Sequence, residues 1–223
     1  MIECEDLVFH YRGGEFSFRI PSCRIDDGET IALVGPSGCG KTTFLNLLAG
    51  ILVPDRGQIR VDGVVLNDLN FAGRQSFRRE RIGLVPQDFE LLDYLSVREN
   101  LLVPFRIGGG FGGLRETAKR AEELAVRAGL KSRLHQFPDR LSQGEKQRTA
   151  LCRGLVLSPR LILADEPTGN LDPENQERVV DLMLEEAGRI GATIVMITHE
   201  PTLRPKFGRV LEMPELIAGE VEA

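Results

Sequence analysis

The glycine-rich stretch GPSGCGKT occupies residues 35–42 and fits the pattern G-x-x-x-x-G-K-[ST]. Its glycines let backbone N–H groups turn inward around phosphate oxygens, and a helix that starts there adds the partial positive charge of its N-terminus. Lys41 reaches the β- and γ-phosphates, and the hydroxyl of Thr42 can ligate Mg²⁺. The alternative is a glycine-rich turn that holds nothing. The stretch therefore predicts a phosphate-binding site formed by Gly35, Pro36, Ser37, Gly38, Cys39, Gly40, Lys41, Thr42 and Thr43.

The run LILADE at residues 161–166 is an apolar segment that ends in two carboxylates. Burying two adjacent acids at a strand end is unfavourable unless something uses them, and neighbouring side chains on a strand point in opposite directions. We therefore expect two different roles. Asp165 contributes to the Mg²⁺ shell through water, and Glu166 polarises the attacking water. The alternative is an ordinary solvated strand end.

The polar stretch LSQGEKQR at residues 141–148, here called the signature segment, opens a predicted helix. Ser142 and Glu145 have the spacing of a capping box, and Gly144 lets a ligand approach the backbone closely. The positive end of such a helix is an anion site. Two arrangements stay open: the segment folds across the phosphate loop of its own molecule, or it grips the γ-phosphate of a nucleotide held by a second copy.

These residues need elements that position them. Short apolar runs predict strands buried on both faces at residues 30–35, 81–87, 160–166 and 192–199. A helix is expected over residues 41–49, closed by Gly50. Another is expected to begin at Asp172 as its N-cap, with Pro173 in its first turn. Antiparallel strands are expected over residues 2–25, with a turn at Gly13 and Gly14, and a hairpin over residues 57–66.

Residues 88–157 differ from the rest because helical periodicity dominates there. Ser96 and Glu99 have capping-box spacing, and the glycine-rich run IGGGFGG interrupts the helices. The order is therefore β-rich, then parallel α/β, then a helical insertion, then parallel α/β again.

Composition excludes several classes of protein. The formal charge of −5 argues against a broad grip on nucleic acid, and the four cysteines show no paired spacing for zinc or a disulfide framework. No apolar run reaches the length of a membrane span, and the N-terminus lacks the features of a signal peptide. A reduced cytoplasmic setting is expected, with docking onto a membrane protein left open.

The order and spacing of these motifs resemble an ABC-transporter ATPase: the phosphate loop, the signature segment, LILADEPTGNLD and ITHE span nearly the whole chain. The resemblance implies a P-loop NTPase of the ABC type, with a mostly parallel core sheet, an antiparallel β portion and an inserted helical lobe. It implies a single domain, with residues 1–87 and 158–223 as the catalytic core and 88–157 as the lobe. The run ADEPTGNLD looks most like the subgroup that serves lipoprotein release, macrolide-type export and cell division.

The resemblance also implies roles for single residues. Tyr11 stacks on adenine, Gln87 contacts Mg²⁺ and the attacking water, and His199 contacts the γ-phosphate. Asp172 touches the opposite subunit's site. The signature contacts made in trans map onto Ser142, Gln143, Gly144 and Glu145.

The sequence departs from the family pattern at three places. Gln143 stands where the family has glycine, and Glu145 where glutamine is frequent. The segment after His199 matches only loosely.

The function that the resemblance implies is ATP hydrolysis with Mg²⁺ by a head-to-tail pair of copies, coupled to a membrane permease at the inner face of the cell membrane. The alternative is a membrane-recruited regulator of the cell-division type, which signals through its partner and transports nothing. A repair ATPase or a binder without turnover is disfavoured, since no coiled coil or zinc module is present and Glu166 and His199 are intact.

Overall fold

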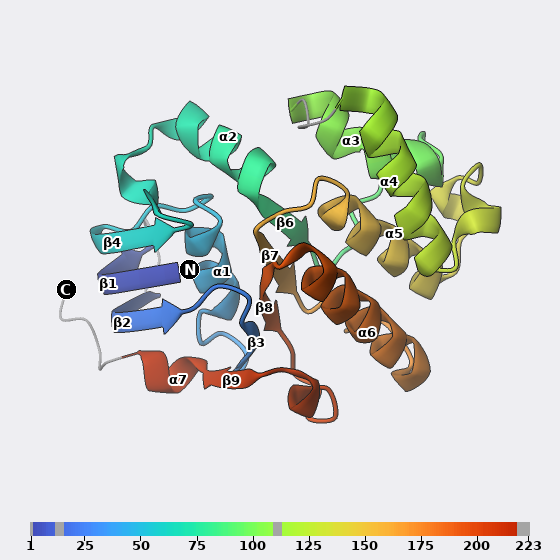
Figure 1. Ribbon diagram of the computed structural model, residues 1–223. Helices are drawn as coiled ribbons and strands as arrows, with labels where there is room; N and C mark the ends of the chain where they lie inside the picture. The colour runs from blue at the N-terminus through green and yellow to red at the C-terminus, as the bar shows by residue number, and fades with distance from the viewer. Residues whose placement is uncertain (1, 12–15, 109–112, 218–223) are drawn as a thin grey trace.

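The structure, a computed structural model, describes residues 2–11, 16–108 and 113–217. Two β-sheets lie side by side in it, with helices between and around them (Figure 1). The first sheet is antiparallel, in the order β2-β1-β4-β5, and its strands are β1 (Ile2–His10), β2 (Ser17–Ile25), β4 (Arg56–Val61) and β5 (Val64–Val65). The predicted antiparallel pair and the hairpin at Asp62 and Gly63 are confirmed. The predicted turn at Gly13 and Gly14 lies outside the described residues.

The second sheet is parallel, in the order β6-β7-β8-β3-β9. Its strands are β3 (Thr30–Val34), β6 (Ile82–Val85), β7 (Leu161–Asp165), β8 (Thr193–Ile197) and β9 (Arg209–Glu212). Four of them are the predicted buried strands. The fifth, β9, comes from the segment that matched the family only loosely, and it pairs with β3 along one edge. Because all five run in one direction, the phosphate loop, Glu166 and His199 emerge from the same edge of the sheet.

Side chains on alternate positions of β3 divide the interior into two cores. Ile31 and Leu33 pack with the helix α1 (Lys41–Leu48) and the inner face of the antiparallel sheet. Ala32 and Val34 pack on the opposite face, against the helices α5 (Gln143–Leu155) and α6 (Pro173–Ile190). In Figure 1, α1 lies between the two sheets and α6 covers the far side. Burial on both faces explains why these strands are continuously apolar.

The predicted helical region is confirmed as α3 (Val97–Gly108), α4 (Gly113–Arg127) and α5, with 3-10 turns at Lys131–Arg133 and Pro138–Arg140. We call α3 to α5 the helical lobe. The Ser96 hydroxyl and backbone N–H both donate to the Glu99 carboxylate, at 2.7 and 2.9 Å, as the capping-box spacing predicted. Most of the run IGGGFGG lies outside the described residues.

The helix α2 (Phe71–Arg81) was not predicted. Asn70 caps it by accepting a bond of 2.8 Å from the N–H of Gly73. Phe77 is its one buried residue, so its sequence carries no apolar stripe. The remaining short elements are 3-10 turns at Leu66–Asp68 and Arg204–Lys206 and the helix α7 (Met213–Leu216).

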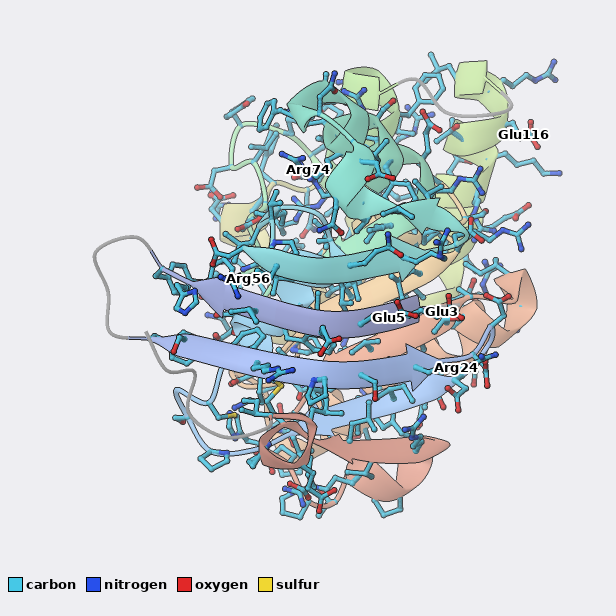
Figure 2. All side chains as sticks on the ribbon, turned by 90° about the vertical axis from the view of Figure 1, so that its left-hand side faces the viewer. Glu3, Glu5, Arg24, Arg56, Arg74 and Glu116 are labelled. Atoms are coloured by element: carbon cyan, nitrogen blue, oxygen red, sulfur yellow. The ribbon has the colours of Figure 1, made fainter. Side chains whose placement is uncertain are left out.

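The outer face of the antiparallel sheet is charged and solvated. Figure 2 looks onto it, with Glu3, Glu5 and Arg24 labelled on β1 and β2. On the inner face, Cys4 and Cys23 are direct partners across the two strands, and both are free thiols. Within the described residues, no helix is both long and apolar enough to span a bilayer.

Candidate functional site

The phosphate loop joins β3 to α1, and its shape depends on glycine. Gly38 and Gly40 have φ of 79° and 96°, in the region that favours glycine. A Cβ on Gly40 would lie 2.8 Å from the ring of Phe16, so a side chain there is also excluded by contact. Lys41 is buried, and its Nζ donates to the carbonyls of Gly35 at 3.0 Å and Pro36 at 2.8 Å. Its ammonium group therefore lies across the loop, where phosphates are expected.

A cavity of about 250 Å³ opens beside this loop. Its described lining residues are Tyr11, Phe16, Ser37, Gly38, Gly40, Lys41, Thr42, Thr43, Glu166 and His199. Nine of these belong to the predicted site set, and two of the nine, Glu166 and His199, reach the cavity from the ends of β7 and β8. Phe16 is a lining residue that the sequence did not point to, since nothing local marks a phenylalanine at the start of a strand as a ligand contact. Pro36 and Cys39 belong to the loop but do not line the cavity.

Tyr11 is tied to the phosphate loop. Its hydroxyl lies 3.2 Å from Oγ1 of Thr43, and its ring centroid lies 6.1 Å from that of Phe16. Tyr11 lines the cavity, and 41 % of its surface is exposed. Two aromatic rings at this position form a surface on which a flat base can stack.

Asp165 and Thr42 form the part of the site that suits a hard cation. The Thr42 hydroxyl donates a hydrogen bond to the Asp165 carboxylate, and burial raises the pKa of Asp165 above its usual range, helped by the nearby charge of Glu166. One hydroxyl and one carboxylate fit Mg²⁺, which keeps several waters and takes its other ligands from phosphates. The residues present therefore fit the predicted ion. Within the described residues, no three His, Cys, Asp or Glu side chains form a complete metal cage.

Glu166 follows the last residue of β7, so strand alternation does not place it, and its carboxylate meets His199. The distance from His199 Nε2 to Glu166 Oε1 is 2.8 Å. Glu166 has φ of 43°, a left-handed conformation that is unfavourable for a non-glycine residue. Its N–H is held by the carbonyl of Ile197 at 3.2 Å, which keeps the strained residue in place. The carboxylate is thereby fixed beside the phosphate loop.

The side chain of Gln87 lies in the same region, beside Gly169, in the segment that follows β6. Its Nε2 and the Oε2 of Glu166 lie 3.8 and 3.9 Å from the position that a Cβ on Gly169 would take. Gln87 is exposed and is not among the described residues that line the cavity. Its amide therefore flanks Glu166 from outside the phosphate loop.

The signature segment begins α5 with a complete capping box. The N–H of Ser142 donates to Oε2 of Glu145 at 2.8 Å, and the N–H of Glu145 donates to the Ser142 hydroxyl at 3.3 Å. Partial burial opposes ionisation of Glu145, but the bonds from Ser142 and from Arg133 outweigh it and lower its pKa. Ser142 and Gln143 are exposed, so the positive end of the helix faces outward.

Asn175 connects the signature segment to Asp172, a link that the sequence did not reveal. Asp172 caps α6, and its Oδ2 accepts a bond of 2.7 Å from Nδ2 of Asn175, which lowers the pKa of Asp172. The Oδ1 of Asn175 accepts from Arg148 of α5 at 3.2 Å. A Cβ on Gly144 would lie 2.9 Å from this same oxygen, so glycine is needed for α5 to approach Asn175 this closely.

Comparison with known proteins places these features in one family. A family model described as "ABC transporter" matches residues 18–169. The chain is similar to Rv0986 of Mycobacterium tuberculosis, an ABC transporter ATP-binding protein, with 37 % identity over 96 % of this chain and 86 % of that protein. It is 40 % identical to the lipoprotein-releasing system ATP-binding protein LolD 1 of Rhodospirillum rubrum, over 86 % of this chain and 84 % of that protein.

Among solved structures, the chain is similar to the ATP-binding cassette MJ0796. The TM-score is 0.85 and the identity 31 %, over 95 % of this chain and 94 % of that one. That structure is described as a dimer in a post-hydrolysis state, bound to ADP and Pi.

Proposed function

This chain belongs to the ABC transporter family, as an ATP-binding subunit that hydrolyses ATP, and we propose that it drives a membrane permease by closing on ATP together with a second copy of itself. The single observation that carries the proposal is where the signature segment lies. None of residues 142–145 is among the described residues that line the nucleotide cavity. An exposed, capped helix start that is absent from its own cavity is available to another molecule's nucleotide.

Two copies facing in opposite directions would bring each signature segment over the other's phosphate loop. The two surfaces suit each other: one offers the positive end of a helix, and the other holds a triphosphate. At that end of the helix, Ser142 and Gln143 are exposed and Gly144 is buried against Asn175. Asp172 shares this surface, because Asn175 connects it to the start of α5. That the similar cassette MJ0796 is dimeric supports pairing of two copies.

The chemistry would run as follows in each shared pocket. Backbone N–H groups of the phosphate loop and Lys41 bind the β- and γ-phosphates. Thr42 and Asp165, with Gln87, would hold Mg²⁺, which supplies positive charge to the phosphate oxygens. Glu166 orients the attacking water. The Nε2 of His199, which lies 2.8 Å from Glu166 Oε1 in this structure, would leave that contact and donate to the γ-phosphate as its charge grows.

The permease would dock in a groove of about 410 Å³ between β6, α2, α3 and α5, here called the lobe groove. Its lining is largely apolar and includes Leu84, Pro86, Leu92 and Ile107. Three arginines also line it: Arg78, Arg79 and Arg153. Such a surface fits the end of an amphipathic helix. Because ATP favours only the closed pair, closing and reopening would move the docked helix.

The whole chain would act as one ATPase domain, with residues 88–157 as the lobe and the rest as the core. It would lie on the inner face of the cell membrane. The similarity to a lipoprotein-releasing system protein favours release or export as the task of the permease.

The Glu166→Gln variant tests the shared pocket. It keeps the shape of the carboxylate but not its charge, so we expect ATP binding close to that of the unchanged chain, no phosphate release, and an ATP-dependent dimer in sedimentation velocity. The matched control adds Ser142→Arg, which blocks the signature surface and should return the protein to a monomer. A chain that stays monomeric with ATP while Glu166→Gln hydrolyses it normally contradicts the proposal.

Docking of the permease is tested in the lobe groove. Ile107→Asp places a charge in the groove, and Val126→Asp places the same charge on another exposed apolar residue of the lobe, outside the groove. We expect Ile107→Asp, and not Val126→Asp, to lose the integral membrane protein that co-purifies from detergent extracts. Both should retain the ATPase activity of the isolated chain. Equal recovery of the membrane protein with both variants would exclude the groove.

A further inference from the structure

Arg153 of α5, the helix that begins at the signature segment, binds the loop that follows Gln87. Arg153 of α5 donates from Nη1 to the carbonyl of Glu90 at 2.5 Å and from Nη2 to the carbonyl of Phe89 at 3.0 Å. These are successive carbonyls, and a planar guanidinium suits two parallel bonds of this kind. Glu90 has φ of 48°, so the loop is in an unfavourable conformation at the place where Arg153 binds it.

The other end of the same loop is fixed to α5 by close packing. A Cβ on Gly83 of β6 would lie 2.4 Å from the carbonyl oxygen of Gly154, and a Cβ on Gly154 would lie 2.9 Å from that of Leu84. The backbones of the strand and the helix therefore pack directly against each other at these glycines. One helix thus holds the loop on both sides of Gln87: through glycine contacts before it, and through Arg153 after it.

Arg153 also meets the lobe groove. Both Arg153 and Glu90 are among its lining residues. Arg153 is half-buried, and burial lowers its pKa. Among the described residues, its guanidinium donates to two backbone carbonyls, and the nearby charge of Glu90 opposes the effect of burial on its pKa.

We propose that Arg153 is a positioning residue for ATP hydrolysis, which sets Gln87 against Glu166 through the carbonyls of Phe89 and Glu90. This inference rests on the roles given above to Gln87 and Glu166. It assigns a physical link between three places: the signature segment at one end of α5, the lobe groove beside Arg153, and the amide of Gln87.

The test is a double-mutant cycle between Arg153 and Gln87. Arg153→Lys keeps the charge but a single ammonium cannot form the two-carbonyl fork, so kcat for ATP should fall about tenfold to a hundredfold with KM little changed. In a Gln87→Ala background the same substitution should change kcat less than about twofold, because the residue through which Arg153 acts is gone. The thermal midpoint of every variant is measured alongside.

Arg120→Lys is the matched control. Arg120 is another half-buried lobe arginine that donates to a backbone carbonyl, that of Leu155 at 3.4 Å, but it does not touch the loop. We expect its kcat within about twofold of the unchanged chain, with or without Gln87. If Arg153→Lys fails to fold, Arg153→Gln assayed with and without millimolar guanidinium replaces it, and recovery of kcat is the expected result.

Three outcomes overturn the inference. Arg153→Lys and Gln87→Ala contribute to kcat independently, or Arg153→Lys raises KM alone, or guanidinium restores nothing to a folded Arg153→Gln. Each of these leaves the proposed function standing as long as Gln87→Ala itself lowers kcat. If Gln87→Ala leaves kcat unchanged, the assigned role of Gln87 and the inference both fall.

Discussion

A buried ion pair joins the helical lobe to the core, and its removal gives a quantitative prediction. Arg127 of α4 binds Glu186 of α6 through two bonds: Nη2 to Oε2 at 2.9 Å, and a shorter one from Nε to Oε1. The Glu186 side chain is 1 % exposed and that of Arg127 27 %. The change considered is Arg127→Met, which keeps an unbranched, flexible side chain, shorter than that of arginine, and removes its charge.

The expected loss follows from the burial of Glu186. Breaking a buried pair by removing one partner costs about 3–5 kcal/mol, because the remaining charge is uncompensated. Arg189 lies 3.5 Å from Oε1 but is 58 % exposed, so it returns at most about 1 kcal/mol. We therefore expect Arg127→Met to lower the free energy of unfolding by about 3 kcal/mol. Replacing both partners, Arg127→Met with Glu186→Leu, should stay within about 1 kcal/mol of the unchanged chain.

Urea unfolding followed by circular dichroism measures these differences. The control is Arg178→Met, which breaks an exposed pair with Glu174 on the same helix α6 and should cost less than about 0.5 kcal/mol. The reasoning is refuted if Arg127→Met costs under about 1 kcal/mol, or if the double variant is no more stable than the single one.

Three further predictions concern the packing, the thiols and the base site. Gly83→Ala should destabilise the fold by about 2 kcal/mol, because its Cβ would meet a carbonyl of α5, whereas Gly188→Ala on an open helix surface should stabilise it by about 0.5 kcal/mol; equal thermal midpoints would contradict this. N-ethylmaleimide should modify Cys39 before Cys152, whose pKa burial raises to about 12, and ATP should slow the modification of Cys39; peptide mapping that finds Cys152 first, or no effect of ATP, would exclude it. Tyr11→Ala should weaken ATP binding about tenfold by titration calorimetry, and Tyr11→Phe, which keeps the ring, less than about threefold; identical losses would mean that the ring does not stack.

Features with short-range rules were predictable from the sequence. The phosphate loop, the capping boxes at Ser96 and Ser142 and the cap at Asp172 depend on residues within a few positions of one another. The buried strands were predictable because a strand covered on both faces is apolar throughout. The helical region between β6 and β7 followed from its periodicity.

Features that depend on distant residues were not predictable in the same way. The helix α2 buries only Phe77, so it has no apolar stripe to detect. Phe16, Asn175 and Arg153 act through neighbours far along the chain, and nothing in their immediate sequence marks them. Cys4 and Cys23 appeared unrelated because only the register of β1 and β2 places them opposite each other.

The helix α5 is both the connection that leads back into the sheet at β7 and the element that presents the signature segment. One residue added to or lost from its middle would rotate its outer end by about 100° relative to the end packed on Gly83. Insertions and deletions that other parts of the lobe accommodate should therefore be rejected here. During evolution, we expect the number of residues in α5 to stay constant while the other segments of the helical lobe vary in length.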